Sequence, residues 1–199
     1  MTSAEIFYFD EPGRQNTDTV IDLVSKSLRK TGIGTVIIAS SSGETALNAI
    51  EHWSNACSNV VVVTSHAGFA GENMLDMKQE TEEKIKLTGA KLVRASHVLS
   101  GLERSFTRKF HGVSRTEVVS ETLRALFGQG MKVCVEISVM ASDSGAIRCG
   151  DEEIIAVGGT GDGADTACII RPAHANDFFR FEVREIIAMP RRKRNSGYK

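Results

Sequence analysis

Two short unbroken apolar runs stand out near the start of this chain. Residues 35–39 (TVIIA) contain four apolar side chains in five positions, and residues 59–64 (NVVVVT) contain four consecutive valines. Such β-branched runs are typical of strands buried on both faces of a parallel sheet. Between them, residues 44–53 place apolar side chains three and four positions apart, which predicts a helix. This alternation predicts an α/β protein with a parallel sheet between helices.

The same patterns extend along the chain. Three- and four-residue spacing predicts helices at residues 17–30, 75–87 and 115–127. Asn16 is expected to cap the first of them and Gly32 to end it, and Ser114 with Glu117 is expected to form a capping box at the start of the third. Apolar or alternating segments predict strands at residues 6–9, 91–95, 131–141, 152–160, 165–172 and 181–189. The last third has strands without good helices between them, so antiparallel or edge strands are expected there. Residues 96–114 are predicted to form a long ordered loop, and loops of this length usually carry function.

Composition narrows the class of protein. Of the 199 residues, 41% are hydrophobic and 25% charged, which is ordinary for a globular protein. No apolar run approaches the length of a membrane span, and the first residues do not resemble a secretory signal. The four cysteines form no CxxC pair, which predicts reduced thiols, no zinc site and no other metal. We therefore expect a cytoplasmic protein with one domain over residues 1–190.

The charge is unevenly distributed. Residues 191–199 carry five basic side chains and no acidic one, whereas the remaining residues carry 19 basic and 25 acidic side chains. An acidic body disfavours nucleic-acid binding, and no membrane partner is expected. The basic segment is predicted to be a disordered tail. A symmetric homo-oligomer is also possible for a chain of this type.

Small polar residues follow five of the predicted strands, those at residues 35–39, 59–64, 91–95, 131–141 and 152–160. In an open parallel sheet, ligands bind beyond the carboxyl ends of the strands. The serines and Gly43 that follow residues 35–39 lie where a helix begins, so hydroxyls and unpaired N–H groups there favour a phosphate. The alternative is that Ser42 only caps the helix. The glycine-rich residues 158–166 form a second small-residue loop on the same rim, although by themselves they also fit a tight hairpin.

Three residues are weak candidates for catalysis. His66 and His97 are expected at the rim, where an imidazole can act as acid or base, although each also fits an ordinary loop residue. Glu136 falls inside a predicted strand, where a buried carboxylate needs a partner. Arg104 is a natural phosphate partner if its loop folds over the rim, and otherwise a solvated side chain.

The segment VIIASSSGETALNAIEHW resembles the strand, loop and helix of the pyruvate kinase C-terminal domain. The motifs SGETAL, TSHAGF, SHVLSG, GGTGDGADTA and EIIAMPR resemble, in order, a family of free-standing proteins related to that domain, over residues 8–191. The resemblance implies a three-layer α/β/α sandwich with a mixed sheet in the order 3-2-1-4-5 and strand 5 antiparallel. It also implies a flavin mononucleotide (FMN) in the rim pocket. Because 199 residues leave no room for the kinase barrel, pyruvate kinase activity is not implied.

The resemblance also assigns binding residues. It implies a phosphate loop of Ser41, Ser42, Gly43, Glu44 and Thr45, a facing loop of Gly163, Ala164, Asp165 and Thr166, and His66, Gly68 and Phe69 near the flavin ring. Other rim residues expected to contribute are Thr64, Ser100, Gly101, Arg104 and Thr160.

Three functions fit this site: a flavin-binding protein, a sensor of a phosphorylated metabolite, and a lyase or isomerase acting on a small phosphate ester with His97 as its acid or base. Whether the protein is an enzyme is left open by the sequence.

Overall fold

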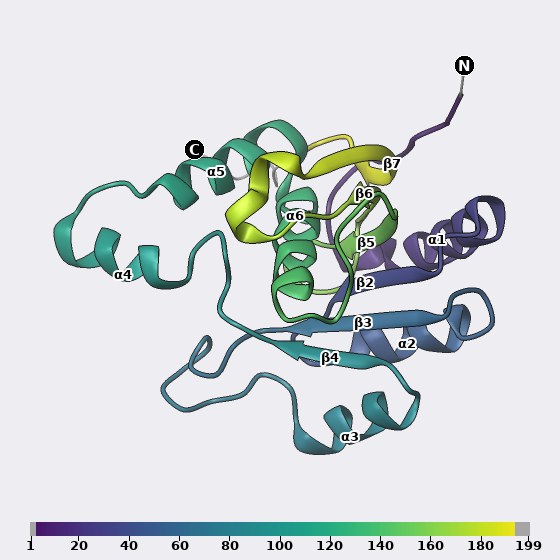
Figure 1. Ribbon diagram of the computed structural model, residues 1–199, viewed down its shortest axis with the longest axis horizontal. Coiled ribbons are helices and arrows are strands. Elements are labelled where there is room, and N and C mark those ends of the chain that lie inside the picture. The colour runs from purple at the N-terminus through teal and green to yellow at the C-terminus, as the bar shows by residue number, and fades with distance from the viewer. Residues whose placement is uncertain (1–2, 194–199) are drawn as a thin grey trace.

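A seven-stranded mixed sheet forms the centre of the molecule in the computed structural model, which describes residues 3–193 (Figure 1). Its order is β1-β7-β6-β5-β2-β3-β4. The strands are β1 (Phe7–Phe9), β2 (Thr35–Ala39), β3 (Asn59–Thr64), β4 (Lys91–Arg94), β5 (Ile154–Gly158), β6 (Thr166–Arg171) and β7 (Glu182–Pro190). Strand β6 is antiparallel to both of its neighbours, and the other pairings are parallel.

The α/β class and the mostly parallel sheet are confirmed, and the strand order differs in detail from the expected one. The order 3-2-1-4-5 accounts for β4-β3-β2-β5-β6, with β6 as the antiparallel member. Strands β7 and β1 then extend the sheet beyond β6, so it has seven strands instead of five. The expectation of an antiparallel strand in the last third is met by β6.

Helices cover both faces of the sheet. One face packs against α1 (Thr17–Thr31), α2 (Glu44–Trp53) and α3 (Gln79–Leu87), and the buried side chains there include Trp53. The other face packs against α6 (Gln129–Asp143), on which α5 (Arg115–Phe127) lies. Figure 1 shows α6 in front of the sheet with α1 and α2 behind it. The sheet thus lies between two layers of helices, in the expected three-layer α/β/α arrangement.

The prediction of a strand at residues 131–141 was wrong, because this segment lies within helix α6. Its alternating apolar residues resemble a strand, yet the helix is buried almost all round, including its polar positions. The hydroxyls of Ser138 and Ser142 donate to the helix carbonyls of Cys134 and Ser138 (2.7 and 2.8 Å), so burial leaves them satisfied. A helix buried on every side has no polar face to reveal its period.

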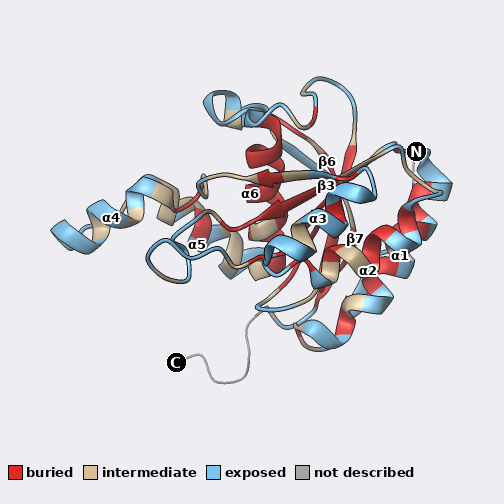
Figure 2. Cartoon of the chain, turned by 90° about the horizontal axis from the view of Figure 1, so that it is seen from below, coloured by how far each residue is buried: buried red, intermediate tan, exposed pale blue. Residues whose placement is uncertain are grey.

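The predicted loop at residues 96–114 contains a second unexpected helix, α4 (Gly101–Phe110). No residue of α4 is buried, and Figure 2 shows it projecting away from the body of the protein. The signal for this helix is the four-residue spacing of Leu102, Phe106 and Phe110, which are 75%, 53% and 65% exposed. The hydroxyl of Thr107 donates to the carboxylate of Glu117 and joins α4 to α5.

The helix ends follow the expected chemistry in two of three cases. Gly32 ends α1 in a left-handed conformation, and its N–H donates to the Leu28 carbonyl (2.9 Å). Ser114 and Glu117 form the expected capping box. The prediction that Asn16 caps α1 was wrong, because its side chain donates to the carbonyl of Glu11 instead (2.8 Å).

The first residues of the basic segment 191–199 contact the body of the protein. The N–H of Arg191 donates to the Phe9 carbonyl (2.7 Å), and Lys193 lies over the Tyr8 ring, 5.8 Å from its centre. These contacts continue the pairing of β7 with β1. Residues 194–199 lie outside the described residues.

Gly130 allows α6 to approach β6 closely, which gives a test of this packing. A Cβ at this position would collide with the side chains of Thr166 and Asp165. We expect Gly130→Ala to lower the free energy of unfolding by about 1–3 kcal/mol, measured by urea denaturation. Gly112→Ala is the control, because a Cβ there meets no atom within 4 Å. A Gly130→Ala variant as stable as the control would contradict this packing.

Candidate functional site

A cavity of about 580 Å³ opens at the carboxyl ends of β2, β3 and β5. From β2 the chain proceeds to β3 and β4 on one side, whereas β5 adds to the other side of β2. The loops after β2 and β5 therefore part at this point of the sheet, and such a switch point is where open α/β sheets bind ligands. The volume lies within the range of about 300–1,000 Å³ usual for small-molecule sites.

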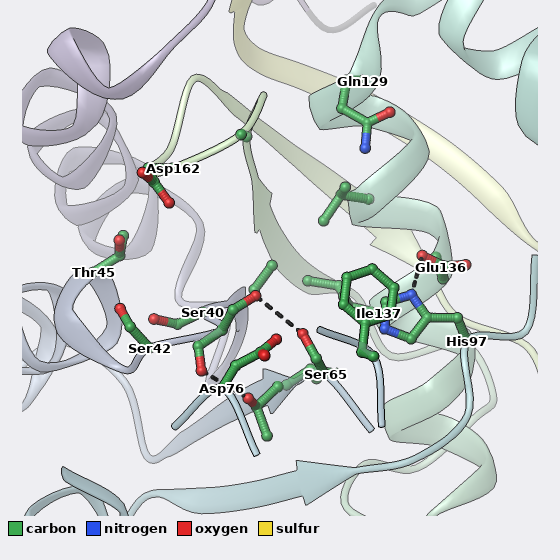
Figure 3. A pocket seen from close by; sticks show the side chains of 18 of the residues that line it. Ser40, Ser42, Thr45, Ser65, Asp76, His97, Gln129, Glu136, Ile137 and Asp162 are labelled. Atoms are coloured by element: carbon green, nitrogen blue, oxygen red, sulfur yellow. Dashed lines mark hydrogen bonds and ion pairs between the residues drawn. The ribbon is translucent and has the colours of Figure 1, made fainter. Parts of the chain in front are cut away.

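The loop after β2 forms one wall of this cavity, and we refer to residues 40–45 as the serine loop. The loop is braced from β3 and its continuation: Thr64 donates to the Ser41 carbonyl (3.0 Å), and Ser65 donates to the Ser41 hydroxyl (3.1 Å). Ser40 accepts the N–H of Ala46 at 3.3 Å. Figure 3 shows Ser40, Ser42 and Thr45 grouped at one end of the cavity.

The first N–H groups of α2 are weakly hydrogen-bonded or have no partner within the described residues. Gly43 occupies the N-cap position, and the Ser42 hydroxyl accepts the N–H of Glu44 only at 3.4 Å. Within the described part of the chain, the N–H of Thr45 has no hydrogen-bond partner. Unpaired N–H groups and the dipole of a helix give its N-terminus a partial positive charge. Ser42 is therefore at most a weak cap. The alternative that Ser42 only caps the helix leaves the N–H of Thr45 unexplained.

Gly43 shapes the loop from behind. Its φ is +90°, and a Cβ there would collide with Thr81 of α3. The glycine lets the loop turn sharply against α3, but it does not line the cavity. It therefore shapes the loop and is not part of the wall that a ligand would contact.

The facing wall differs from the expected one. Gly159, Gly161, Asp162 and Gly163 line the cavity, whereas Ala164, Asp165 and Thr166 are buried behind it. The Asp165 carboxylate accepts the N–H groups of Gly13 and Thr160 (both 3.0 Å) and the Thr166 hydroxyl (2.8 Å).

Asp165 thus ties the β5–β6 loop to the segment before α1. The GADT part of the motif supports the wall from behind, and the glycines before it form the surface.

Helix α6 contributes a buried ion pair to the third wall. Lys132 and Glu136 lie one turn apart and are 4% and 3% exposed. The Lys132 ammonium donates to Glu136 Oε2 at 2.5 Å, and the N–H of Leu99 donates to Oε1 at 3.1 Å. His97 Nδ1 lies 3.3 Å from Oε2. This carboxylate therefore joins α6 to the segment that follows β4.

The ion pair has shifted pKa values. Burial opposes ionisation of Glu136, but the hydrogen bond with His97 and the charge of Lys132 outweigh burial and lower its pKa to about 2. Burial also lowers the pKa of Lys132, and the Glu136 carboxylate offsets part of that change. Glu136 is consequently a carboxylate at neutral pH and only accepts hydrogen bonds.

Three aromatic rings meet beside this ion pair. Phe69 stacks on His97 with ring centres 4.9 Å apart, and His66 meets both rings edge-on. A second cavity of about 450 Å³ adjoins the first at Phe69 and Arg104. It is lined by His66, Gly68, Ser100, Gly101, Ser105, Arg108 and Lys109 as well.

The structure thus brings together many of the predicted residues. The first cavity is lined by Ser41, Ser42, Glu44, Thr45, Thr64, Phe69, His97, Arg104, Glu136 and Gly163. The second is lined by His66, Gly68, Ser100 and Gly101. Neither cavity is lined by Gly43, Thr160, Ala164, Asp165 or Thr166.

Several lining residues were not assigned to the site from the sequence: Arg14, Asp76, Arg124, Gln129, Lys132 and Asp162. Ser40 and Ser65 also line the cavity, and they were expected at the rim but not among the binding residues. Lys132 is detectable once its segment is treated as a helix, because it lies four residues before Glu136. Ser40 and Ser65 directly follow predicted strands, which is a signal for the rim. No local signal marks Arg124 or Gln129, which the α5–α6 junction brings to the cavity.

Two further features concern the described residues 3–193. No group of His, Cys, Asp and Glu there has the arrangement of a metal site, and the four cysteines are free thiols. Among those residues we also find no helix with the length and apolar character needed to cross a membrane.

Comparison with protein families places this architecture. The model of the pyruvate kinase alpha/beta domain matches residues 18–170 of the 199. The chain belongs to the pyruvate kinase alpha/beta domain family. The matched range begins in α1 and ends in β6, so it includes the serine loop, helix α6 and the glycines of the facing wall.

Proposed function

We propose that the protein binds a phosphate-bearing ligand, with FMN as the first candidate, and that the phosphate lies at the serine loop. The observation that carries this proposal is the start of α2, where hydroxyls and the unpaired N–H of Thr45 border a cavity of about 580 Å³. Helix N-termini of this kind bind phosphate through their N–H groups and dipole. Phe69, which is 45% exposed, offers a flat apolar surface for a ring system.

The charges around the cavity limit where an anion fits. Glu44, Asp76 and Asp162 also line it, so negative charge is disfavoured across much of the wall. Arg14 lies beside the serine loop and pairs with Glu44 at 3.5 Å, with both side chains largely exposed. This arginine is free to turn to a phosphate, since an exposed pair contributes about 1 kcal/mol or less.

A titration tests the proposal. We expect FMN to bind at micromolar concentration, followed by quenching of its fluorescence, and Ser42→Ala/Thr45→Val to bind more than about tenfold more weakly, because hydrogen bonds to charged groups contribute about 1.5–3 kcal/mol each. Ser58→Ala is the control, since its hydroxyl donates to the Gly34 carbonyl near the start of β3. Equal affinity of the double variant and the control would place the phosphate elsewhere, and no uptake of FMN would exclude it as the ligand.

A ligand with a second anionic group is the other candidate, as in a metabolite sensor. Arg104, Arg108 and Lys109 line the adjoining cavity, where they would face a second phosphate. A thermal-shift measurement distinguishes the two, because sugar bisphosphates would then raise the melting temperature and FMN would not. A thermal screen without a shift for any phosphorylated compound would contradict both candidates.

A further inference from the structure

The imidazole of His97 is held in one orientation by a chain of buried charges. Its Nδ1 faces the Glu136 carboxylate at 3.3 Å, and that carboxylate is in turn held by Lys132. Because Glu136 only accepts hydrogen bonds, the proton of a neutral His97 belongs on Nδ1. The other ring nitrogen, Nε2, then carries a lone pair.

Nε2 is the one buried side-chain nitrogen or oxygen of the described chain that has no hydrogen-bond partner. A buried polar atom left without a hydrogen-bond partner is destabilising, which favours a state in which a ligand supplies the missing partner. Phe69 stacks on the face of this imidazole, whereas the lone pair of Nε2 lies in the plane of the ring. His97 lines the first cavity, so a ligand bound there is the partner available to this nitrogen.

The serine loop and His97 lie on different walls of the same cavity. Figure 3 shows Ser42 and Thr45 at one side and His97 with Glu136 at the other. Gln129 supplies a hydrogen-bond donor to the same cavity: Arg124 donates to Gln129 Oε1 at 2.5 Å, which leaves the Gln129 amide nitrogen free, and Figure 3 shows it pointing into the cavity. Phosphate, base and donor thus surround one ligand-sized space.

We propose that His97 is the acid–base residue of this cavity and that its substrate is a phosphorylated hydroxy-aldehyde or hydroxy-ketone. This inference rests on the phosphate site proposed above. A carbon next to a carbonyl is the class of C–H bond that a histidine can ionise, because the negative charge moves to oxygen. Glu136 and Lys132 act as positioning residues that fix the ring.

The step balances without an oxidant or a second substrate. Nε2 forms a bond to the proton of the carbon beside the carbonyl, the C–H electron pair becomes the double bond of an enediolate, and the carbonyl π pair moves to oxygen. The Gln129 amide donates to that oxygen. The imidazolium then returns its proton to either of the two carbons, while the hydroxyl proton moves to the other oxygen when the product is the isomer.

Hydrogen–deuterium exchange tests this step. The protein is incubated in D2O with a panel of three- to six-carbon aldose and ketose phosphates, and deuterium at the carbon beside the carbonyl is followed by NMR. We expect exchange with at least one compound, and a loss of about 100-fold or more in His97→Gln. His52→Gln should exchange as the wild type does, because His52 is an exposed residue of α2 that contacts its own helix.

Binding of inorganic phosphate is measured in parallel and separates the two proposals. Phosphate binding that persists in His97→Gln, with exchange lost, supports both. Phosphate binding without exchange by the wild type overturns only the acid–base role, and absence of phosphate binding overturns the site itself.

Nitrogen NMR of the wild type keeps the inference testable if His97→Gln does not fold. We expect the proton of neutral His97 on Nδ1, and loss of this preference in the double variant Lys132→Met/Glu136→Met. A wild-type His97 with its proton on Nε2 would overturn the inference.

Discussion

Glu136→Gln is expected to lower the free energy of unfolding by about 3–5 kcal/mol, the usual cost of removing one partner from a buried ion pair. The substitution leaves the Lys132 ammonium, which is 4% exposed, without a counter-charge. Lys132→Met should also destabilise, because it removes the strongest donor to the carboxylate. Urea denaturation at pH 7 followed by circular dichroism measures both changes.

The double variant Lys132→Met/Glu136→Met should regain most of this loss, since two apolar side chains of similar volume often replace a buried ion pair at little cost. Lys86→Met is the matched control. Lys86 pairs with Glu82 at the same four-residue spacing (2.7 Å) but is 59% exposed, so we expect less than about 1 kcal/mol. A Glu136→Gln variant whose free energy of unfolding is within about 1 kcal/mol of the wild-type value would show that the ion pair does not stabilise the fold.

Acidification is expected to remove about 3 kcal/mol of stability through Glu136 alone. Its pKa is about 2 in the folded protein, against an ordinary value of 4.5. The native state therefore binds this proton more weakly than the unfolded state. The stabilisation is complete above the unfolded value and is lost as the pH falls through the folded value.

Comparison with the double variant isolates this effect. The pKa values of Glu82, Glu117 and Glu182 are also lowered, mainly by hydrogen bonds from their neighbours, but these residues are the same in both proteins. We expect the wild type to lose about 2 kcal/mol of stability relative to Lys132→Met/Glu136→Met between pH 7 and pH 3. A constant difference over this range would contradict the lowered pKa.

The ion pair links these predictions to the site. If the double variant is as stable as the wild type, the buried charges are not needed for folding. Their remaining effect is on His97, whose Nδ1 they hold in place. Stability and histidine orientation can therefore be separated in a single pair of proteins.

The sequence predicts the first half of the fold well, because its local signals agree with its packing. Residues 35–39 and 59–64 are strands with the predicted bounds, and the helix at residues 44–53 also has its predicted ends. In each case an apolar run or stripe is bounded by polar residues or glycine. The serine loop follows from these bounds, since it consists of the four residues between the strand at residues 35–39 and this helix and the first two residues of the helix.

The errors in the second half arise from tertiary packing. Helix α6 is buried on nearly every side, so its sequence lacks the polar face that identifies a helix. The 11-residue length of the predicted strand at residues 131–141 was the available signal, because strands usually have about 3–10 residues. Helix α4 was missed for a different reason. Its apolar stripe faces solvent, whereas an apolar stripe usually packs against a core, so its spacing was not taken as a helix.

The sequence predicts the part of the candidate site that lies within one continuous loop. The hydroxyls of the serine loop need no knowledge of distant residues. By contrast, Lys132, Glu136 and His97 come together only because α6 lies beside the end of β4. This contact could not be predicted while residues 131–141 were assigned to a strand. Asp165 was assigned to the ligand through the family resemblance of its motif, whereas all three of its hydrogen bonds hold the protein together.

The sheet order has a consequence for how the protein folds. Strand β2 pairs with β5, so Val36 lies beside Ile155 although more than a hundred residues separate them along the chain. Closing so long a loop loses chain entropy before the contact between the strands contributes favourable free energy. Folds rich in such long-range contacts therefore form slowly. The serine loop and the glycines that face it are brought together only by this pairing. A nascent chain that has not yet reached residue 154 contains every residue of the serine loop, but it has no cavity.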